Sequence, residues 1–232
     1  MRKFPEILSL LLITGMLLAG CAIYNPKPTG IALITAKKEL KVDAGVSAIP
    51  SAYANLSYGL TKALAIQAFG SLEPAHCYYF QGAGGFYKGY ANHAVLEVYV
   101  GYGFGYGYVY KDAVPGSLYG NYQQYFTQVN FGFAHLSFAH MEVGAGLKSG
   151  VLHASLTNRN YYGFYSETGP FYTLSYNNWL LEPDFMIRLG GERLKVSLNA
   201  GFCRMNKIPP SARVVPFAPV NIALGLHYIF NP

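Results

Sequence analysis

The sequence contains little charge and, beyond its first 20 residues, no long apolar run. Charged residues make up 12% of the chain, and the basic ones are scattered, with one small cluster at Lys37, Lys38 and Lys41. The basic stripe used by nucleic-acid-binding proteins is therefore missing. A membrane-spanning helix needs about 20 consecutive apolar residues, and no later segment supplies them. These absences argue against a nucleic-acid partner and against a helical membrane protein.

Residues that hold metals or form disulfides are also scarce. The chain has three cysteines and six histidines, and the histidines show no zinc-type spacing. An oxidising compartment would permit a disulfide between Cys77 and Cys203, but the strand assignment below separates them, which favours two free thiols. The Gly-x-Gly run at 101–107 precedes no helix, so it is not a nucleotide-binding loop. We expect no metal site and no non-covalent cofactor.

The N-terminus has the organisation of a secretion signal. A short basic start, an apolar run over residues 7–18 and small residues before Cys21 predict a signal peptide over residues 1–20. Residues 18–21, Leu-Ala-Gly-Cys, resemble the lipobox of bacterial lipoproteins. The resemblance implies cleavage before Cys21 and a covalent lipid on that residue. An ordinary signal peptide with a chance cysteine is the alternative.

Downstream of the signal, the sequence divides into a tether and one domain. Pro26 and Pro28 indicate irregular structure, so residues 21–37 are predicted to be a lipidated tether. Residues 38–232 are predicted to form a single domain of ordinary size.

Within that domain the dominant hydrophobic period is two, which indicates β-strands. Along residues 95–110, large apolar side chains such as Val98, Val100 and Tyr102 alternate with glycines and with Glu97. Alternate residues of a strand point to opposite faces. One face is therefore large and apolar, and the other is small and polar. The same alternation predicts ten strands, at 39–48, 51–60, 63–70, 77–88, 95–110, 119–134, 138–157, 178–190, 193–204 and 219–230.

This pattern predicts an all-β fold, an antiparallel transmembrane β-barrel of about ten strands in a bacterial outer membrane. Eight strands remain an alternative, because 51–60 and 63–70 are short. The connections near 61–62, 89–94, 135–137 and 191–192 are short, and those near 158–177 and 205–218 are long. Short periplasmic turns and longer outer loops are typical of outer-membrane barrels. The alternative is a soluble barrel, which would place its apolar side chains inside. Several of the predicted strands are longer than the strands of soluble folds usually are.

The chain as a whole resembles small, uncharacterised outer-membrane β-barrel lipoproteins of Bacteroidota-type bacteria. The matching features are Leu-Ala-Gly-Cys at 18–21, the Asn25–Lys27 tether, Lys-Glu-Leu at 38–40, the run 101–105 and a last strand ending at Phe230. The resemblance brings no activity. Acidic residues after the cysteine, which that group uses for surface export, are replaced here by Ala-Ile-Tyr. Their absence favours a lipid anchor that faces the periplasm.

Charged side chains gather on the face predicted to point into the barrel. This lumen network comprises Asp43, Glu97, Glu142, Lys148, Glu182, Asp184, Arg188 and Lys195, with Lys41 beside it. Opposite charges in a narrow barrel can pair and fill it, which predicts a structural role. The alternative is a narrow conduit for small solutes, although a barrel of about eight strands is normally filled by side chains.

Two further features concern activity and partners. His153 and Ser155 share one strand face, as a general base and a nucleophile could. They resemble the His-x-Ser pair of outer-membrane lipid A deacylases. The acidic partner of such a site is unassigned, with Glu167 in the following loop as a candidate. By parity both point outward, so an incidental pair is favoured. The loops 158–177 and 205–218 are candidates for binding an extracellular ligand or protein. We expect a structural or surface-interaction role, with outer-membrane lipid as surroundings.

Overall fold

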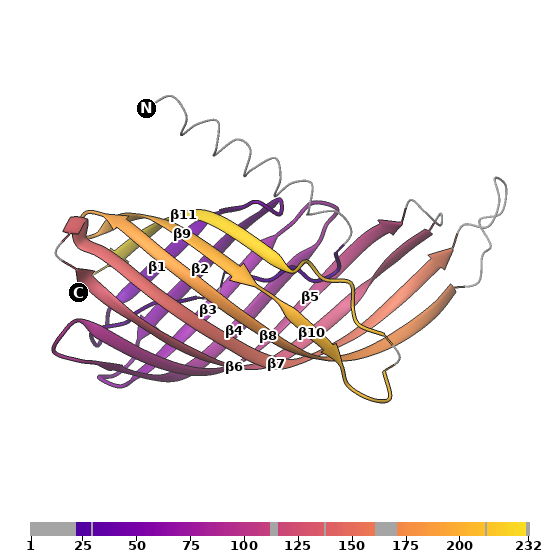
Figure 1. The fold of residues 1–232 in the computed structure, drawn as a ribbon, viewed down its shortest axis with the longest axis horizontal. Coiled ribbons are helices and arrows are strands. Elements are labelled where there is room, and N and C mark those ends of the chain that lie inside the picture. Colours follow the sequence, from indigo (N-terminus) through magenta and orange to yellow (C-terminus); the bar gives the residue numbers. More distant parts are fainter. Residues whose placement is uncertain are drawn as a thin grey trace, which may run out of the picture.

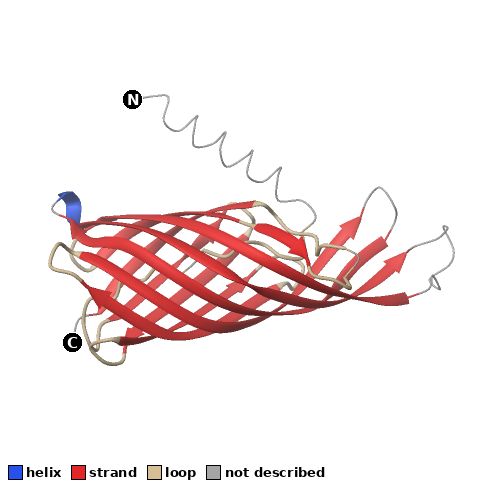
Figure 2. Cartoon of the chain, turned by 60° about the horizontal axis from the view of Figure 1, so that its bottom comes forward, coloured by secondary structure: helices blue, strands red, loops and turns tan. Residues whose placement is uncertain are grey.

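The computed structural model describes residues 22–28, 30–111, 116–136, 138–160, 171–211 and 213–230. Over these residues the strands are β1 (Leu40–Ser47), β2 (Ser51–Gly59), β3 (Leu64–Leu72), β4 (Tyr78–Gly89), β5 (Ala94–Lys111), β6 (Gly116–Leu136), β7 (Met141–Asn160), β8 (Phe171–Gly190), β9 (Leu194–Phe202), β10 (Arg204–Lys207) and β11 (Val220–Phe230). The described helical structure is one 3₁₀ turn, Phe138–His140 (Figure 2). Among the described residues, no helix is long and apolar enough to cross a membrane.

The strands close into one antiparallel barrel (Figure 1). From β1 to β8 each strand pairs with the next, and β1 pairs with β11, which returns to β8 through β9. The short β10 follows β9 after an interruption at Cys203 and also pairs with β8, so the two occupy one position in the wall. The wall therefore has ten positions. The prediction of a ten-stranded antiparallel barrel is confirmed, and the alternative of eight strands is wrong.

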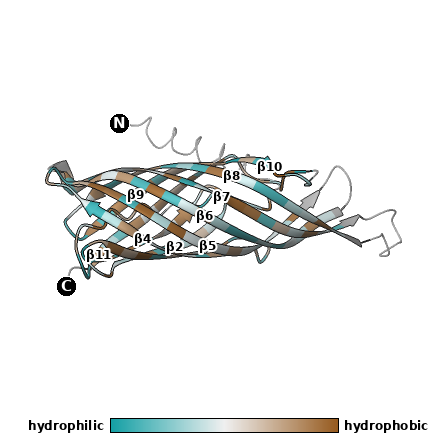
Figure 3. Ribbon diagram, turned by 90° about the horizontal axis from the view of Figure 1, so that it is seen from below, coloured by the Kyte–Doolittle hydropathy of each residue, from teal (hydrophilic) through white to brown (hydrophobic). Residues whose placement is uncertain are grey.

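Side chains face the two sides of the wall as the alternation predicted. Large apolar residues such as Leu147, Phe185 and Leu224 are exposed on the outside. Charged residues such as Glu142, Lys148 and Arg188 are buried inside. Figure 3 shows this as alternating bands of hydrophobic and hydrophilic residues along the strands. The arrangement is the reverse of a soluble barrel, because the apolar surface faces outward.

The two ends of the barrel differ. One end, the turn end, carries the turns 60–63, 90–93 and 191–193, together with the start of β1 and the finish of β11. The other, the loop end, carries the connections 73–77 and 208–219. Strands β5 to β8 have 18 to 21 residues, against 8 or 9 in β1 to β3, and project beyond the rest at the loop end (Figure 1). The two ends therefore differ as the loop lengths predicted, but the difference arises mainly from the unequal lengths of the strands.

The predicted loop at 158–177 is wrong over much of its length. Strand β7 continues to Asn160, and β8 begins at Phe171 instead of 178. The cause is a reversal of polarity, because in β8 Thr173 and Ser175 face outward while Tyr176 is buried inside. Residues 161–170 lie outside the described part of the chain.

Both internal cysteines are free, as expected, and both are buried. Cys77 precedes β4, where burial raises the pKa of its thiol. Cys203 lies at the interruption between β9 and β10. A raised pKa leaves the Cys77 thiol protonated and a poor nucleophile.

Candidate functional site: the barrel lumen

The interior of the barrel is occupied by the protein's own N-terminal residues. We call residues 22–28 and 30–35 the luminal segment. At the loop end, Tyr24 forms a parallel bridge with Phe217, and at the turn end the chain joins β1 beside Gly59. Side chains from Ile23 to Ile34 in the described part are buried. The described residues of this segment form no helix and no regular strand, and they run along the lumen instead of lying outside the barrel as a free tether.

The wall supplies hydrogen bonds that this extended segment cannot make with a neighbouring strand. Buried backbone groups without partners are costly, and here charged and amide side chains satisfy them. Gln67 Nε2 and Asn130 Nδ2 both donate to the Gly30 carbonyl. Arg188 Nη2 donates to the Ile31 carbonyl, and Lys41 Nζ donates to the Leu33 carbonyl. In the other direction, the Ile34 backbone amide donates to Glu97 Oε1. Several of these side chains therefore depend on the segment for their own pairing.

Apolar side chains of the segment pack on both sides of the lumen. Ile31 and Leu33 contact a cluster that includes Val95 and Met186. Ala32 and Ile34 contact a second cluster, formed with Ala65, Tyr87 and Tyr99. The segment thus alternates like a strand whose two faces are both buried.

Glycines of the wall make room for the segment. A Cβ added at Gly144 would lie 2.8 Å from Ile31 Cγ2, and one at Gly107 would lie 2.5 Å from the Ile23 carbonyl oxygen. Neither distance is compatible with a larger residue unless the segment moves. The small inner face seen in the sequence therefore accommodates an occupant, which the alternation alone did not reveal.

Four members of the predicted lumen network meet in one cluster near the turn end. Arg188 lies 3.1 Å from Glu142 and 3.3 Å from Asp43, and Lys195 lies 2.6 Å from Glu142. Lys41 is 3.8 Å from the same Glu142 carboxylate. His227 joins this cluster although it is not among the predicted members, since its Nδ1 lies 3.5 Å from Asp43. Its inward parity on the last strand is the sequence signal that identifies it.

The remaining members lie elsewhere in the lumen. Lys148 and Glu182 form a separate pair at 3.5 Å, and Tyr24 donates to Glu182 at 2.9 Å. Glu97 accepts from Asn130 at 2.9 Å. Asp184 is buried on the same inner face. The structure therefore divides the predicted network into separate groups, which are bridged by the luminal segment and by amide side chains.

The described residues enclose a small cavity in the lumen. A cavity of about 10 Å³ lies between the segment and the wall, lined by residues that include Pro28, Gly30, Asn55 and Arg188. That volume holds at most about one water molecule. Among the described residues, no group of three or more histidine, cysteine, aspartate and glutamate side chains could hold a metal ion.

His153 and Ser155 both lie on the outer wall of β7 and are exposed, as their parity predicted. The His153 ring nitrogen Nδ1 is 2.6 Å from Asn177 Oδ1 on β8. No hydrogen bond joins His153 to Ser155 in the described structure, and Glu167 lies outside it. The described residues do not assemble the base and nucleophile of an acyl-transfer site.

The outer wall changes polarity along the long strands. In the register of β6, β7 and β8, the row Tyr125, Val151, Trp179 is apolar and aromatic, and the next row towards the loop end is Gln123, His153, Asn177. The following row is Asn121, Ser155, Ser175. The projecting part of these strands, beyond the aromatic row, is called the extension. On its inner face Leu152 and Leu156 are buried in one cluster with Ile23, and Val215 of the connection 208–219 packs in the same cluster.

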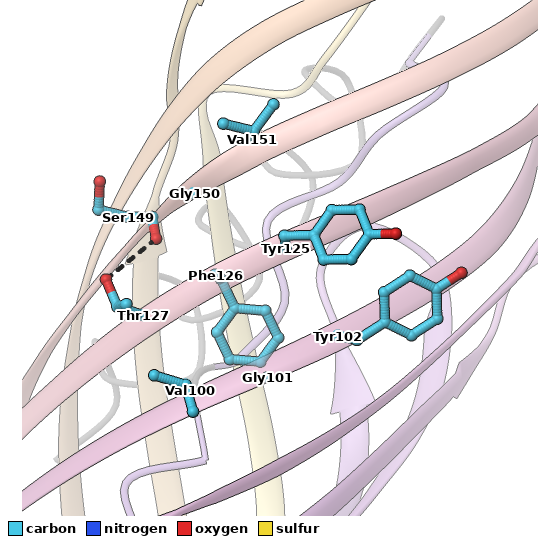
Figure 4. A pocket seen from close by; sticks show the side chains of 9 residues that line it. All are labelled: Val100, Gly101, Tyr102, Tyr125, Phe126, Thr127, Ser149, Gly150 and Val151. Atoms are coloured by element: carbon cyan, nitrogen blue, oxygen red, sulfur yellow. Dashed lines mark hydrogen bonds between the residues drawn. The ribbon is translucent and has the colours of Figure 1, made fainter.

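An apolar groove includes part of the aromatic row (Figure 4). It has a volume of about 580 Å³ on the outer wall of β5, β6 and β7, and Tyr102, Tyr125 and Val151 are among its lining residues. Its lining residues also include Thr127, whose hydroxyl donates to the Ser149 carbonyl at 3.4 Å. The groove belongs to the band of exposed apolar side chains around the outer wall, here called the apolar belt.

A closed antiparallel barrel with an apolar exterior and a polar interior has the architecture of outer-membrane β-barrels. No known protein family matches the chain, and no curated protein matches it. It is similar to the solved N-terminal β-barrel domain of Pseudomonas aeruginosa OprF, with 11% identity, a TM-score of 0.35 and coverage of 84% of this chain and 98% of that one. It is also similar to the KdgM porin, solved in complex with disordered oligogalacturonate, with 10% identity, a TM-score of 0.39 and coverage of 83% and 99%.

Proposed function

We propose that this protein is a closed barrel of the bacterial outer membrane with a structural or surface-interaction role. The observation that carries the proposal is the filled lumen, in which the luminal segment and the buried ion pairs occupy the space that a conduit would need. A barrel of ten strands is narrow, and open channels need about sixteen. The apolar belt matches the requirement that lipid-facing side chains be apolar while backbone groups pair within a closed sheet.

The proposal includes a covalent lipid on Cys21 after removal of residues 1–20. Its support is the Leu-Ala-Gly-Cys sequence after a short apolar run. Incorporation of radiolabelled palmitate into the protein, and its loss in Cys21→Ala, tests this part separately from the barrel.

The extension is the surface that such a protein would present. Its outer rows carry amide and hydroxyl side chains, which suit contacts with water or with a polar partner. The predicted interaction loop 205–218 contributes less, because Val215 is buried in the cluster behind the extension and the Pro216 carbonyl accepts from the backbone of Ile23 and Tyr24. An extracellular ligand or protein would therefore meet the outer wall of β6 to β8.

Purified full-length protein reconstituted in liposomes tests the closed lumen. A difference in gel migration between unboiled and boiled samples establishes that the barrel is folded. Protection from protease establishes that it is inserted in the liposomes. We expect neither swelling in sugar solutions nor steady single-channel conductance. Steady conductance by the folded protein would overturn the proposal in favour of a conduit. Loss of acyl chains from co-reconstituted lipid A would overturn the proposal in favour of an enzyme, if mass spectrometry detects it with the protein and not with Ser155→Ala.

A further inference from the structure

The luminal segment has a direction that its contacts define. Ala36 lies at the turn end, where its carbonyl accepts from the Glu39 backbone and Gly59 adjoins it. Proceeding towards the N-terminus, the segment passes Glu97 at Ile34 and the Asp43–Arg188 cluster at Ile31. The chain therefore travels away from the turn end as residue numbers fall.

At the loop end the segment emerges past the short strands. Lys27 and Asn25 both bind Glu73, in the connection that follows β3. Beyond that level, the Ile23 and Tyr24 amides donate to the Pro216 carbonyl at 2.9 and 3.1 Å, and the Ala218 amide donates to the Tyr24 carbonyl at 3.0 Å. Ile23 and Tyr24 thus pack against the inner face of the extension.

Two observations orient the barrel in the membrane. The turn end holds both the start of β1 and the finish of β11, and outer-membrane barrels keep their short turns in the periplasm. The loop end holds the extension, where the next two outer rows of β6 to β8 beyond Tyr125 and Trp179 are polar, while the paired strand β5 carries the exposed aromatic residues Phe104 and Tyr108. Tyrosine and tryptophan at the border of an apolar belt are typical of the membrane interface.

From these contacts we infer that the mature N-terminus passes through the barrel and is presented at the cell surface. The inference rests on the proposed outer-membrane location. Any lipid carried by the residue before Ala22 is then delivered to the outer leaflet. One residue spans about 3.5 Å, whereas the hydrocarbon core is about 30 Å thick, so a lipid there has no route back to the periplasmic leaflet. The anchor expected from the sequence to face the periplasm is assigned to the opposite side.

Epitope tags on living cells test the inference. One tag is inserted between Cys21 and Ala22, a second between Pro210 and Ser211 at the loop end, and a third between Gly191 and Glu192 at the turn end. Antibody binding is measured on intact and on permeabilised cells. We expect the first two tags to bind antibody on intact cells, and the third to bind only after permeabilisation.

The outcomes separate this inference from the proposed function. If the first tag behaves like the third while the second is exposed, the N-terminus does not reach the surface and the inference is overturned. If the second and third tags show no difference, the barrel does not span the outer membrane as proposed, and both conclusions are overturned.

A smaller probe covers the case in which a tag prevents assembly. In a Cys77→Ala, Cys203→Ala background, Ala22→Cys and Glu192→Cys are treated on intact cells with a membrane-impermeant maleimide. The inference expects labelling at position 22 at least tenfold above that at position 192. Equal labelling at the two positions, or stronger labelling at 192, would overturn it.

Discussion

Arg188 illustrates how single charges are held inside this barrel. Its guanidinium contacts Asp43 and Glu142 and donates to the Ile31 carbonyl. A guanidinium can serve several acceptors at once because its donors form a rigid fork. The residue therefore joins the wall to the luminal segment as well as pairing two carboxylates.

Removal of this side chain should destabilise the barrel strongly. In Arg188→Leu the carboxylates of Asp43 and Glu142 lose a buried partner, and breaking a buried pair costs about 3–5 kcal/mol. Urea unfolding of the reconstituted protein measures the loss. Arg193→Leu, at an exposed turn, is the matched control and should leave the transition unchanged. Equal midpoints for the two variants would contradict the role assigned to Arg188.

Two glycines test whether the segment fills the lumen closely. Valine at Gly144 would collide with Ile31, whereas a Cβ at Gly84 meets nothing within 4 Å. Overpacking of a filled interior costs about 1–3 kcal/mol, so Gly144→Val should lower the temperature at which the folded band disappears on gels. Gly84→Val should not lower it. A tolerant Gly144 would mean that the lumen has spare room.

At the level of elements, the outer face of β7 changes polarity where the proposed membrane border would lie. Its outward residues change from Val143, Ala145 and Leu147 to His153, Ser155 and Thr157 within one continuous strand. A sheet face can change its surroundings along its length because side-chain direction depends only on parity. In the proposed membrane location, the border would lie near Val151, which pairs with Trp179.

A charge placed on either side of this border should have different effects. Arginine facing lipid near the midplane costs about 2–4 kcal/mol, and near or beyond the interface about 0–1 kcal/mol. We therefore expect Leu147→Arg to destabilise folding in lipid vesicles by about that larger amount, and Ser155→Arg to have little effect. Denaturant unfolding of both variants in the same vesicles checks the difference. Similar losses would place the border elsewhere.

The elements also show what the sequence could predict. Alternation located the ten wall positions because a lipid-facing strand has an apolar exterior and a polar interior along its length. The same rule missed residues 171–177, where Thr173 and Ser175 face outward and Tyr176 inward. Beyond the proposed membrane border a strand would have the polarity of a soluble sheet, so outward apolar residues no longer identify it.

For the whole molecule, the luminal segment was the feature that the sequence concealed. It forms no regular ladder, and its backbone is paired by side chains from distant strands, such as Gln67, Asn130 and Arg188. Such contacts leave no local period. The short apolar stretch Ile-Ala-Leu-Ile at 31–34 and the unusually small inner face were the signals, and each has a meaning only once the barrel is known.

The account depends above all on the position of this segment within the closed barrel. A Cβ at Gly30 would lie 3.0 Å from Asn55 Cγ, the atom whose place the Sγ of a cysteine at 55 would take, so cysteines at these two positions are close enough for a disulfide. In a Cys77→Ala, Cys203→Ala background, the pair Gly30→Cys and Asn55→Cys should cross-link in folded protein within the membrane fraction. The pair Gly30→Cys and Ser155→Cys should not, because Ser155 faces outward. A folded barrel in which the first pair stays reduced under oxidation would contradict the central claim that the luminal segment, residues 22–28 and 30–35, fills the lumen.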